Sequence, residues 1–233
     1  MIVVMGSKGG AGATTVAAGL IGAANTRVIP VDLGLTNDLV GLGDRNWSTQ
    51  SLDMLARLPD SRLDKAIAAM FSGRRPAAFA LSGQGRVLHV KEAAGVLDLI
   101  ESHGVLVADM GIQPLPFMLD LATHVALVLT PDPRSLRRAE QFTRQNSRLS
   151  IVPVLNMARP GECGVAYDEM IILPDAGRTD PLHDEAWIRA VEPLAEQLGL
   201  VGLQSREHSA PARMRSQRLF DWRGLIPRVR VVE

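Results

Sequence analysis

The sequence predicts an α/β fold in which a doubly wound, mostly parallel sheet carries helices on both faces. Short apolar runs recur along the 233 residues, and most of them are separated by segments of helical character. Strands that alternate with helices in this way form parallel sheets with right-handed crossovers. A glycine-rich loop follows the first apolar run, and ligands of such folds bind beyond the carboxyl ends of the strands. The expected ligand site therefore lies at that loop.

Apolar runs and helical segments give the expected elements in order along the chain. Short runs rich in Val, Ile and Leu predict strands, at residues 2–5, 28–31, 87–90, 105–108, 125–129, 151–155 and 170–173. Longer segments predict helices, at residues 14–24, 52–57, 63–71, 93–102, 135–145 and 185–198. The first of these helices is rich in alanine and directly follows the glycine loop.

The composition predicts one globular domain at residues 1–203 and a C-terminal tail at residues 204–233. The chain is 46% hydrophobic and 4% aromatic, which at this length gives a core that needs no disulfides. Residues 204–218 are mostly polar and charged, as in an exposed connection or a partly ordered tail. The apolar side chains between Leu219 and Ile226 could dock on the domain or contact a membrane or a partner.

Charge and cysteine content indicate the cellular compartment of the protein and limit its general binding partners. The formal net charge is zero, so no global field draws the chain to nucleic acid or to a membrane surface, although local patches can. Cys163 is the only cysteine, which excludes an intrachain disulfide and favours the cytosol. No run has the pattern of a signal peptide or the length of a membrane span. We therefore expect a cytoplasmic protein.

The loop from Gly6 to Thr15 carries the clearest functional motif. Its glycines allow conformations in which successive N–H groups face phosphate oxygens, and the following helix adds the positive end of its dipole. Thr14 occupies the Mg²⁺-binding hydroxyl position of the G-x-x-x-x-G-K-[ST] pattern, and Ala13 occupies the lysine position. The motif predicts a phosphate site, formed by Gly9, Gly10, Ala11, Gly12, Ala13, Thr14 and Thr15. A glycine-rich turn without a ligand is the alternative.

The early lysine in this loop is the discriminating residue. The stretch Lys8-Gly9-Gly10-x-Gly12-x-Thr14-Thr15 resembles the deviant Walker A motif, K-G-G-x-G-K-[ST]-T, of the ParA/MinD family of P-loop ATPases. In that family the early lysine, matched by the catalytic candidate Lys8, reaches across a nucleotide-sandwich dimer to the partner's phosphates. The second lysine is replaced by Ala13. The resemblance implies ATP and Mg²⁺ as cofactors and a homodimer. Because the missing lysine removes positive charge from the site of phosphoryl transfer, we expect slow or absent hydrolysis.

Two aspartates follow apolar runs and are, with Thr14, the candidate Mg²⁺ ligands. This cation takes oxygen ligands such as carboxylates. Asp32 matches the second acid of the family's switch I region, a catalytic position associated with the attacking water, and the first acid falls on Pro30. Asp109 resembles a Walker B aspartate, although an aspartate after a strand is also a common turn former.

The nucleotide base is expected beside the strand at residues 151–155. Asn156 follows this strand and matches the position from which family members recognise adenine. Side-chain amides suit that task because they both donate and accept hydrogen bonds, but a turn-forming asparagine is equally open here. Pro174 and Asp175 resemble the family's later loop beside the base.

The resemblance is closest to the TadZ/CpaE branch, which is associated with tight-adherence (Flp) pilus assembly. It implies a nucleotide-dependent dimer that positions a pilus or secretion machine, at a cell pole or peripherally on the inner face of the membrane. A MinD-like septum-site protein and a ParA-type partition protein that binds DNA non-specifically are alternatives, as is a chain that binds no nucleotide. Arg134, Arg137 and Arg138 form either a solvated helix start or a basic partner surface.

Overall fold

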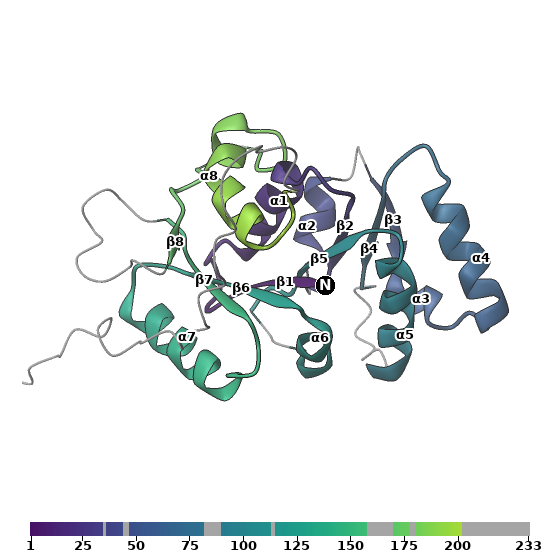
Figure 1. Ribbon diagram of the computed structural model, residues 1–233, viewed down its shortest axis with the longest axis horizontal. Helices are drawn as coiled ribbons and strands as arrows, with labels where there is room; N and C mark the ends of the chain where they lie inside the picture. The colour runs from purple at the N-terminus through teal and green to yellow at the C-terminus, as the bar shows by residue number, and fades with distance from the viewer. Residues whose placement is uncertain are drawn as a thin grey trace, which may run out of the picture.

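An eight-stranded parallel sheet forms the centre of the molecule (Figure 1). The computed structural model describes residues 1–34, 36–43, 47–81, 90–112, 115–157, 170–177 and 180–201. The strand order is β3-β4-β2-β5-β1-β6-β7-β8, and each strand runs parallel to its neighbours. The predicted doubly wound α/β fold is therefore confirmed.

Strands and helices alternate along most of the chain. The strands are β1 Ile2–Gly6, β2 Val28–Asp32, β3 Ser48–Ser51, β4 Ala77–Ala80, β5 Val105–Asp109, β6 His124–Leu129, β7 Ile151–Leu155 and β8 Ile171–Ile172. The helices are α1 Ala13–Ala23, α2 Asp38–Leu42, α3 Leu52–Leu55, α4 Asp60–Phe71, α5 Val90–Glu101, α6 Pro116–Leu121, α7 Pro133–Gln145 and α8 Glu185–Gln197. Apart from the strand at residues 87–90, the expected elements are present with slightly shifted ends.

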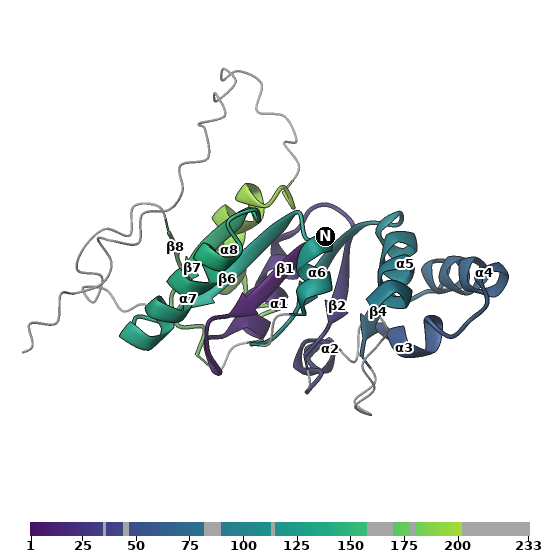
Figure 2. The same ribbon diagram turned by 90° about the horizontal axis from the view of Figure 1, so that it is seen from below.

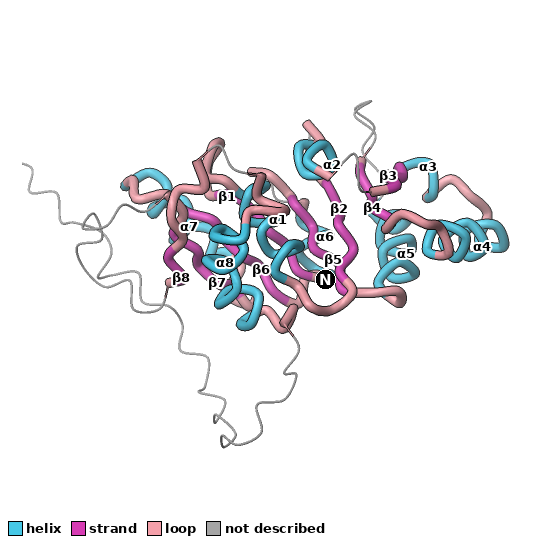
Figure 3. Tube along the Cα trace, turned by 90° about the horizontal axis from the view of Figure 1, so that it is seen from above, coloured by secondary structure: helices cyan, strands magenta, loops and turns pink. Residues whose placement is uncertain are grey.

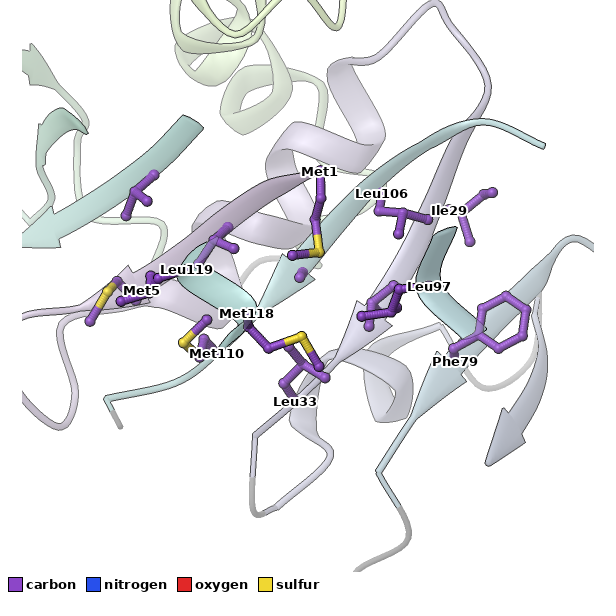
Figure 4. Close-up of a cluster of buried hydrophobic side chains, with 14 of the residues drawn as sticks. Met1, Met5, Ile29, Leu33, Phe79, Leu97, Leu106, Met110, Met118 and Leu119 are labelled. Atoms are coloured by element: carbon purple, nitrogen blue, oxygen red, sulfur yellow. The ribbon is translucent and has the colours of Figure 1, made fainter. Parts of the chain in front are cut away.

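Helices cover both faces of the sheet and enclose two hydrophobic cores. Helices α1, α2 and α8 pack on one face (Figure 3). The other face carries α5, α6 and α7, with α3 and α4 beside α5 (Figure 2), and Figure 4 shows part of its core. Successive side chains of a strand point to opposite faces. Strand β1 accordingly sends Ile2 and Val4 into the first core and Val3 and Met5 into the second.

A close contact between α1 and α8 holds the helix that follows the glycine loop. Gly19 of α1 permits this contact, because a Cβ at that position would lie only 2.5 Å from the indole Nε1 of Trp187. The Trp187 side chain is buried, and its Nε1 donates a hydrogen bond to the carbonyl oxygen of Thr15 at 3.3 Å. Helix α8 therefore positions the first turn of α1.

One predicted strand is wrong, and the apolar pattern predicts neither β3 nor β4. Val90 begins helix α5 and does not end a strand, while residues 87–89 lie outside the described residues. The strand before α5 is β4, whose sequence Ala-Ala-Phe-Ala has little intrinsic strand preference but is buried throughout. Strand β3 is polar and lies at the edge of the sheet, where its pairing with β4 holds it. Tertiary context decides both strands.

The predicted domain boundary at residue 203 stays a prediction, because the tail at residues 204–233 lies outside the described part of the chain.

Pro30, which takes the place of the first switch I acid, lies within β2 opposite Val107 of β5. Strand β4 pairs with β2 only at Val31 and Asp32, beyond this proline. In the described ranges, no helix is both long and apolar enough to cross a membrane.

Candidate nucleotide site

The glycine loop leaves the carboxyl end of β1, between the ends of β5 and β6. The backbone N–H of Gly6 donates to the carbonyl oxygen of Gly111 at 2.7 Å, and that of Ser7 donates to Val128 at 2.9 Å. Strand β1 lies between β5 and β6 in the sheet. These two bonds therefore fix the start of the loop at the centre of the carboxyl edge.

The second half of the loop has a left-handed backbone and ends on an open helix N-terminus. Gly10 has a φ of 72° and Gly12 a φ of 86°, a region that residues with a Cβ rarely adopt. The N-cap residue of α1 is Gly12, so no side chain caps the start of this helix. The first N–H groups of a helix have no partner within it. Those of Ala13, Thr14 and Thr15 are thus oriented to receive an anion.

Lys8 lies on the opposite side of the loop, against the N-terminus of α7. Its Nζ atom is 2.9 Å from Oδ2 of Asp132, and both side chains are about one third exposed. Asp132 is the N-cap of α7 and accepts hydrogen bonds from the backbone N–H groups of Arg134 and Ser135, each at 3.0 Å. Lys8 thus forms an ion pair within its own subunit.

Asp132 is a site residue that the sequence analysis missed. Partial burial raises the pKa of its carboxyl group, but hydrogen bonds from Thr130 and Lys8 and from the Ser135 backbone outweigh this and hold the pKa well below its usual range. Ser135 also contacts the loop, since its Oγ lies 2.5 Å from Oγ of Ser7. The signal was present in the sequence as an aspartate before a proline, which is a pattern of helix starts.

Asp32 and Asp109 lie side by side at the ends of β2 and β5, where they are register partners. Asp32 is fully buried, and its carboxylate accepts hydrogen bonds from the N–H groups of Gly34 at 3.0 Å and Val40 at 3.1 Å. Asp109 is also buried, and its Oδ1 accepts from the N–H of Gly111 at 2.9 Å. The structure therefore brings together two carboxylates that the sequence separates widely.

Thr14 links these carboxylates to the glycine loop, because its side chain forms a hydrogen bond with Asp109. Burial raises the pKa of Asp32 to about 6; the neighbouring charge of Asp109 adds to this effect, while the N–H groups of Val40 and Gly34 oppose it. Burial also raises the pKa of Asp109, against the hydrogen bonds from Thr14 and Gly111. A cation between the two carboxylates would relieve this unfavourable charge.

The donor set fits Mg²⁺ bound together with a phosphate group. No cluster of three or more His, Cys, Asp or Glu side chains that could hold a metal occurs among the described residues. Mg²⁺ is commonly held by one or two carboxylates plus substrate phosphates and water. Thr14, Asp32 and Asp109 supply oxygens of this kind below a loop with free N–H donors.

The raised pKa of Asp32 predicts a pH-dependent stability. Because the folded pKa of about 6 lies above the usual value of 3.8 for an aspartate, folding takes up a proton between these pH values, and stability falls as pH rises through this window. A shift of this size corresponds to about 3 kcal/mol. Relative to Asp32→Asn, the wild-type, nucleotide-free protein should therefore lose most of this free energy of unfolding between pH 4 and pH 7. Denaturant unfolding at both pH values measures it, and equal pH slopes for the two proteins would contradict it.

The predicted base-side residues lie at the other end of the carboxyl edge. Asn156 follows β7 and is 1% exposed, and its Nδ2 donates to the carbonyl oxygen of Ala11 at 2.9 Å. Pro174 and Asp175 follow β8, the neighbour of β7, and are exposed. Asp175 accepts a hydrogen bond from the N–H of Gly177 at 2.9 Å. Through its bond to Ala11, Asn156 therefore contacts the glycine loop itself.

Comparison with known proteins gives a match at the level of fold. No protein-family model matches the chain, and no curated protein sequence matches it. A ParA family ATPase from Chlorobium tepidum TLS superposes with a TM-score of 0.63 at 19% identity, over 84% of this chain and 98% of that one. The MinC:MinD cell division protein complex of Aquifex aeolicus also gives a TM-score of 0.63, at 18% identity over 91% of this chain and 98% of that one.

A third solved structure of similar fold has a bound ligand, AMPPNP. It is a putative plasmid partition protein from Borrelia burgdorferi B31 bound to AMPPNP, with a TM-score of 0.60 at 13% identity, over 84% of this chain and 97% of that one. At such low identities the likeness establishes the fold. The described chain has the parallel α/β fold of the ParA and MinD P-loop ATPases.

Proposed function

We propose that this protein binds Mg-ATP at the glycine loop and uses the bound state to form a homodimer. The observation that supports this most directly is the arrangement of Thr14, Asp109 and Asp32 below an uncapped helix N-terminus. In this proposal the backbone of residues 9–15 binds the phosphates, and the Thr14 hydroxyl and the two carboxylates hold Mg²⁺. Bound Mg²⁺ would offset charge on the phosphates.

The base would lie beyond the ends of β7 and β8. Asn156 follows β7, and Pro174 and Asp175 follow β8, so all three lie at that end of the carboxyl edge. The partition protein bound to AMPPNP supports the choice of an adenine nucleotide, because it shares this fold.

Hydrolysis by this site is proposed to be slow or absent. Phosphoryl transfer needs positive charge on the transferring group, and the position next to Thr14 carries Ala13 where related loops carry lysine. Lys8 is the remaining cation of the loop, and it is paired with Asp132 in the single subunit. To serve a partner's phosphates, Lys8 would exchange Asp132 for those phosphates. The ion pair is partly exposed, so this exchange costs little.

The cellular role that we propose is that of a localisation or scaffold protein, as in the TadZ/CpaE branch, acting on a pilus or secretion machine. It would work in the cytoplasm, at a pole or at the inner face of the membrane. A MinD-like positioning role uses the same dimer and stays open beside it. The loop keeps its nucleotide-binding groups but lacks the second lysine. This combination favours a protein that acts as a positional switch and not as a rapid ATPase.

A ParA-type partition protein is the second candidate, and helix α7 is the observation in its favour. Arg134, Arg137 and Arg138 are exposed in the first turns of α7, where the helix dipole disfavours cations. Within the described residues these three arginines form no ion pair. An anionic partner would offset this cost. Retention on DNA at low salt in the presence of ATP, weakening steeply as salt rises, would favour this candidate.

Titration calorimetry with ATP tests the proposed binding. We expect heat of binding that requires Mg²⁺, and an affinity lower by on the order of tenfold or more in Asp109→Asn, because the carboxylate holds both Thr14 and the cation. Asp120→Asn is the matched control, since Asp120 is an exposed carboxylate paired with Arg148 at the surface. Absence of binding by the wild-type protein, with and without Mg²⁺, would contradict the proposal.

A further inference from the structure

We propose that Asn156 is a positioning residue that shapes the phosphate loop, so that losing its side chain weakens binding of the phosphates themselves. The inference rests on the nucleotide site proposed above. It assigns Asn156 to the phosphate end of that site, whereas the resemblance to the ParA/MinD family associates this position with the base.

The Asn156 side chain is fixed by the sheet and reaches directly into the loop. Its backbone N–H donates to the carbonyl oxygen of Leu129 at 2.8 Å, which ties it to the end of β6. The residue is 1% exposed, and its Nδ2 donates to the carbonyl oxygen of Ala11 at 2.9 Å. Asn156 therefore joins the ends of β6 and β7 to the middle of the loop.

This hydrogen bond sets the direction of a backbone donor. In a trans peptide unit the C=O and the following N–H point in opposite directions. Because the carbonyl of Ala11 points at Asn156, the N–H of Gly12 points away from it, together with the free N–H groups at the start of α1. Among the described residues, the Asn156 amide is the donor that holds the Ala11 carbonyl in this orientation.

The loop is also shaped to accommodate the amide. Gly12 has a φ of +86°, and a Cβ on it would lie 2.2 Å from Nδ2 of Asn156 and 3.7 Å from Cε of Met157. Both the backbone conformation and the missing side chain of Gly12 are thus needed for Asn156 to contact the loop. The next residue, Met157, has a positive φ of 59°, so the chain turns sharply once the asparagine is placed.

The side-chain oxygen of Asn156 is available for a second contact. Oδ1 of Asn156 is buried and has no hydrogen-bond partner among the described residues. This oxygen could accept a hydrogen bond from a base as well. The direct contact to Ala11 nevertheless predicts that the loss extends to ligands that have no base.

Comparing ATP with inorganic tripolyphosphate separates the two roles. We measure the affinity of Mg-ATP and of Mg-tripolyphosphate by calorimetry for wild type and Asn156→Ala, well below the melting temperature of each. Asn156→Ala is expected to weaken both ligands by a similar factor, about tenfold or more. A variant that weakens ATP but leaves tripolyphosphate unchanged overturns the inference, and so does a variant with wild-type affinity for both.

Two further variants keep the experiment decisive. Asn146→Ala is the matched control, because Nδ2 of Asn146 makes a bond of the same kind and length, 2.9 Å to the carbonyl oxygen of Phe142, at the far end of α7; it should leave both affinities unchanged. If Asn156→Ala does not fold, Asn156→Ser replaces it, since serine ends short of the Ala11 carbonyl. Wild-type protein that binds neither ligand refutes the proposed nucleotide site as well, whereas the outcomes above refute only the role of Asn156.

Discussion

Replacing Ala13 by lysine is expected to raise the rate of ATP hydrolysis by on the order of 100-fold, the contribution typical of one preorganised electrostatic group. Ala13 is the first residue of α1 and directly precedes Thr14, whose side chain bonds to Asp109. A lysine at this position would bring its ammonium group to the phosphates that the loop is proposed to bind. It would supply the charge that the transferring phosphoryl group requires.

Single-turnover measurements with Mg-ATP bound to the protein give this rate without interference from product release. Ala13→Met is the matched control, because methionine has similar length but no charge, and we expect it to leave hydrolysis as slow as in the wild type. Rapid wild-type turnover that Ala13→Lys leaves unchanged would show that the second lysine is dispensable, and the assignment of this protein as a slow positional switch would fail.

Replacing Lys8 by alanine is expected to abolish ATP-dependent dimerisation while leaving the monomer folded. Within the described part of the chain Lys8 is paired with Asp132, and this pair is partly exposed, so its loss should change the free energy of unfolding by less than about 1 kcal/mol. In the proposed dimer the same ammonium group meets a partner's phosphates, where charge-assisted bonds in a water-excluded interface are worth more. The effect of the variant should therefore appear in assembly and not in stability.

Light scattering after size exclusion, with and without Mg-ATP, measures the assembly. Lys65→Ala provides the control, because Lys65 is an exposed lysine on α4, remote in sequence from the loop. A Lys8→Ala protein that dimerises with ATP as readily as the wild type would remove the proposed contact across the interface.

The fold was predictable from the sequence where local pattern and burial agree. Strands β1, β2, β5, β6 and β7 are short apolar runs buried on both faces, which is the pattern of a central parallel strand. Helix α7 was predictable because its exposed arginines and buried apolar side chains alternate with the helical period. Strands β3 and β4 lack such a pattern, since polar and alanine-rich segments become strands only through the neighbours that pair with them.

The residues of the candidate site also differ in whether the sequence could predict them. Glycine spacing, Thr14 and the aspartates after Val31 and Ala108 could be recognised because the chemistry needs those residue types in that order along the chain. The residues that contact the loop from other parts of the chain could not be recognised from the sequence. Asp132 is an ordinary helix cap in the sequence, and Asn156 is an ordinary polar residue after a strand.

The sequence by itself determined the strand–loop–helix unit, the deviant position of Lys8 and the absence of a lysine at position 13. Only the tertiary structure decided which groups meet there: Lys8 with Asp132, Asp32 with Asp109, and Asn156 with Ala11. The physical reason is that the carboxyl ends of parallel strands converge on one edge. The order and register of the strands, which depend on packing over the whole sheet, therefore decide which distant residues become neighbours at the loop.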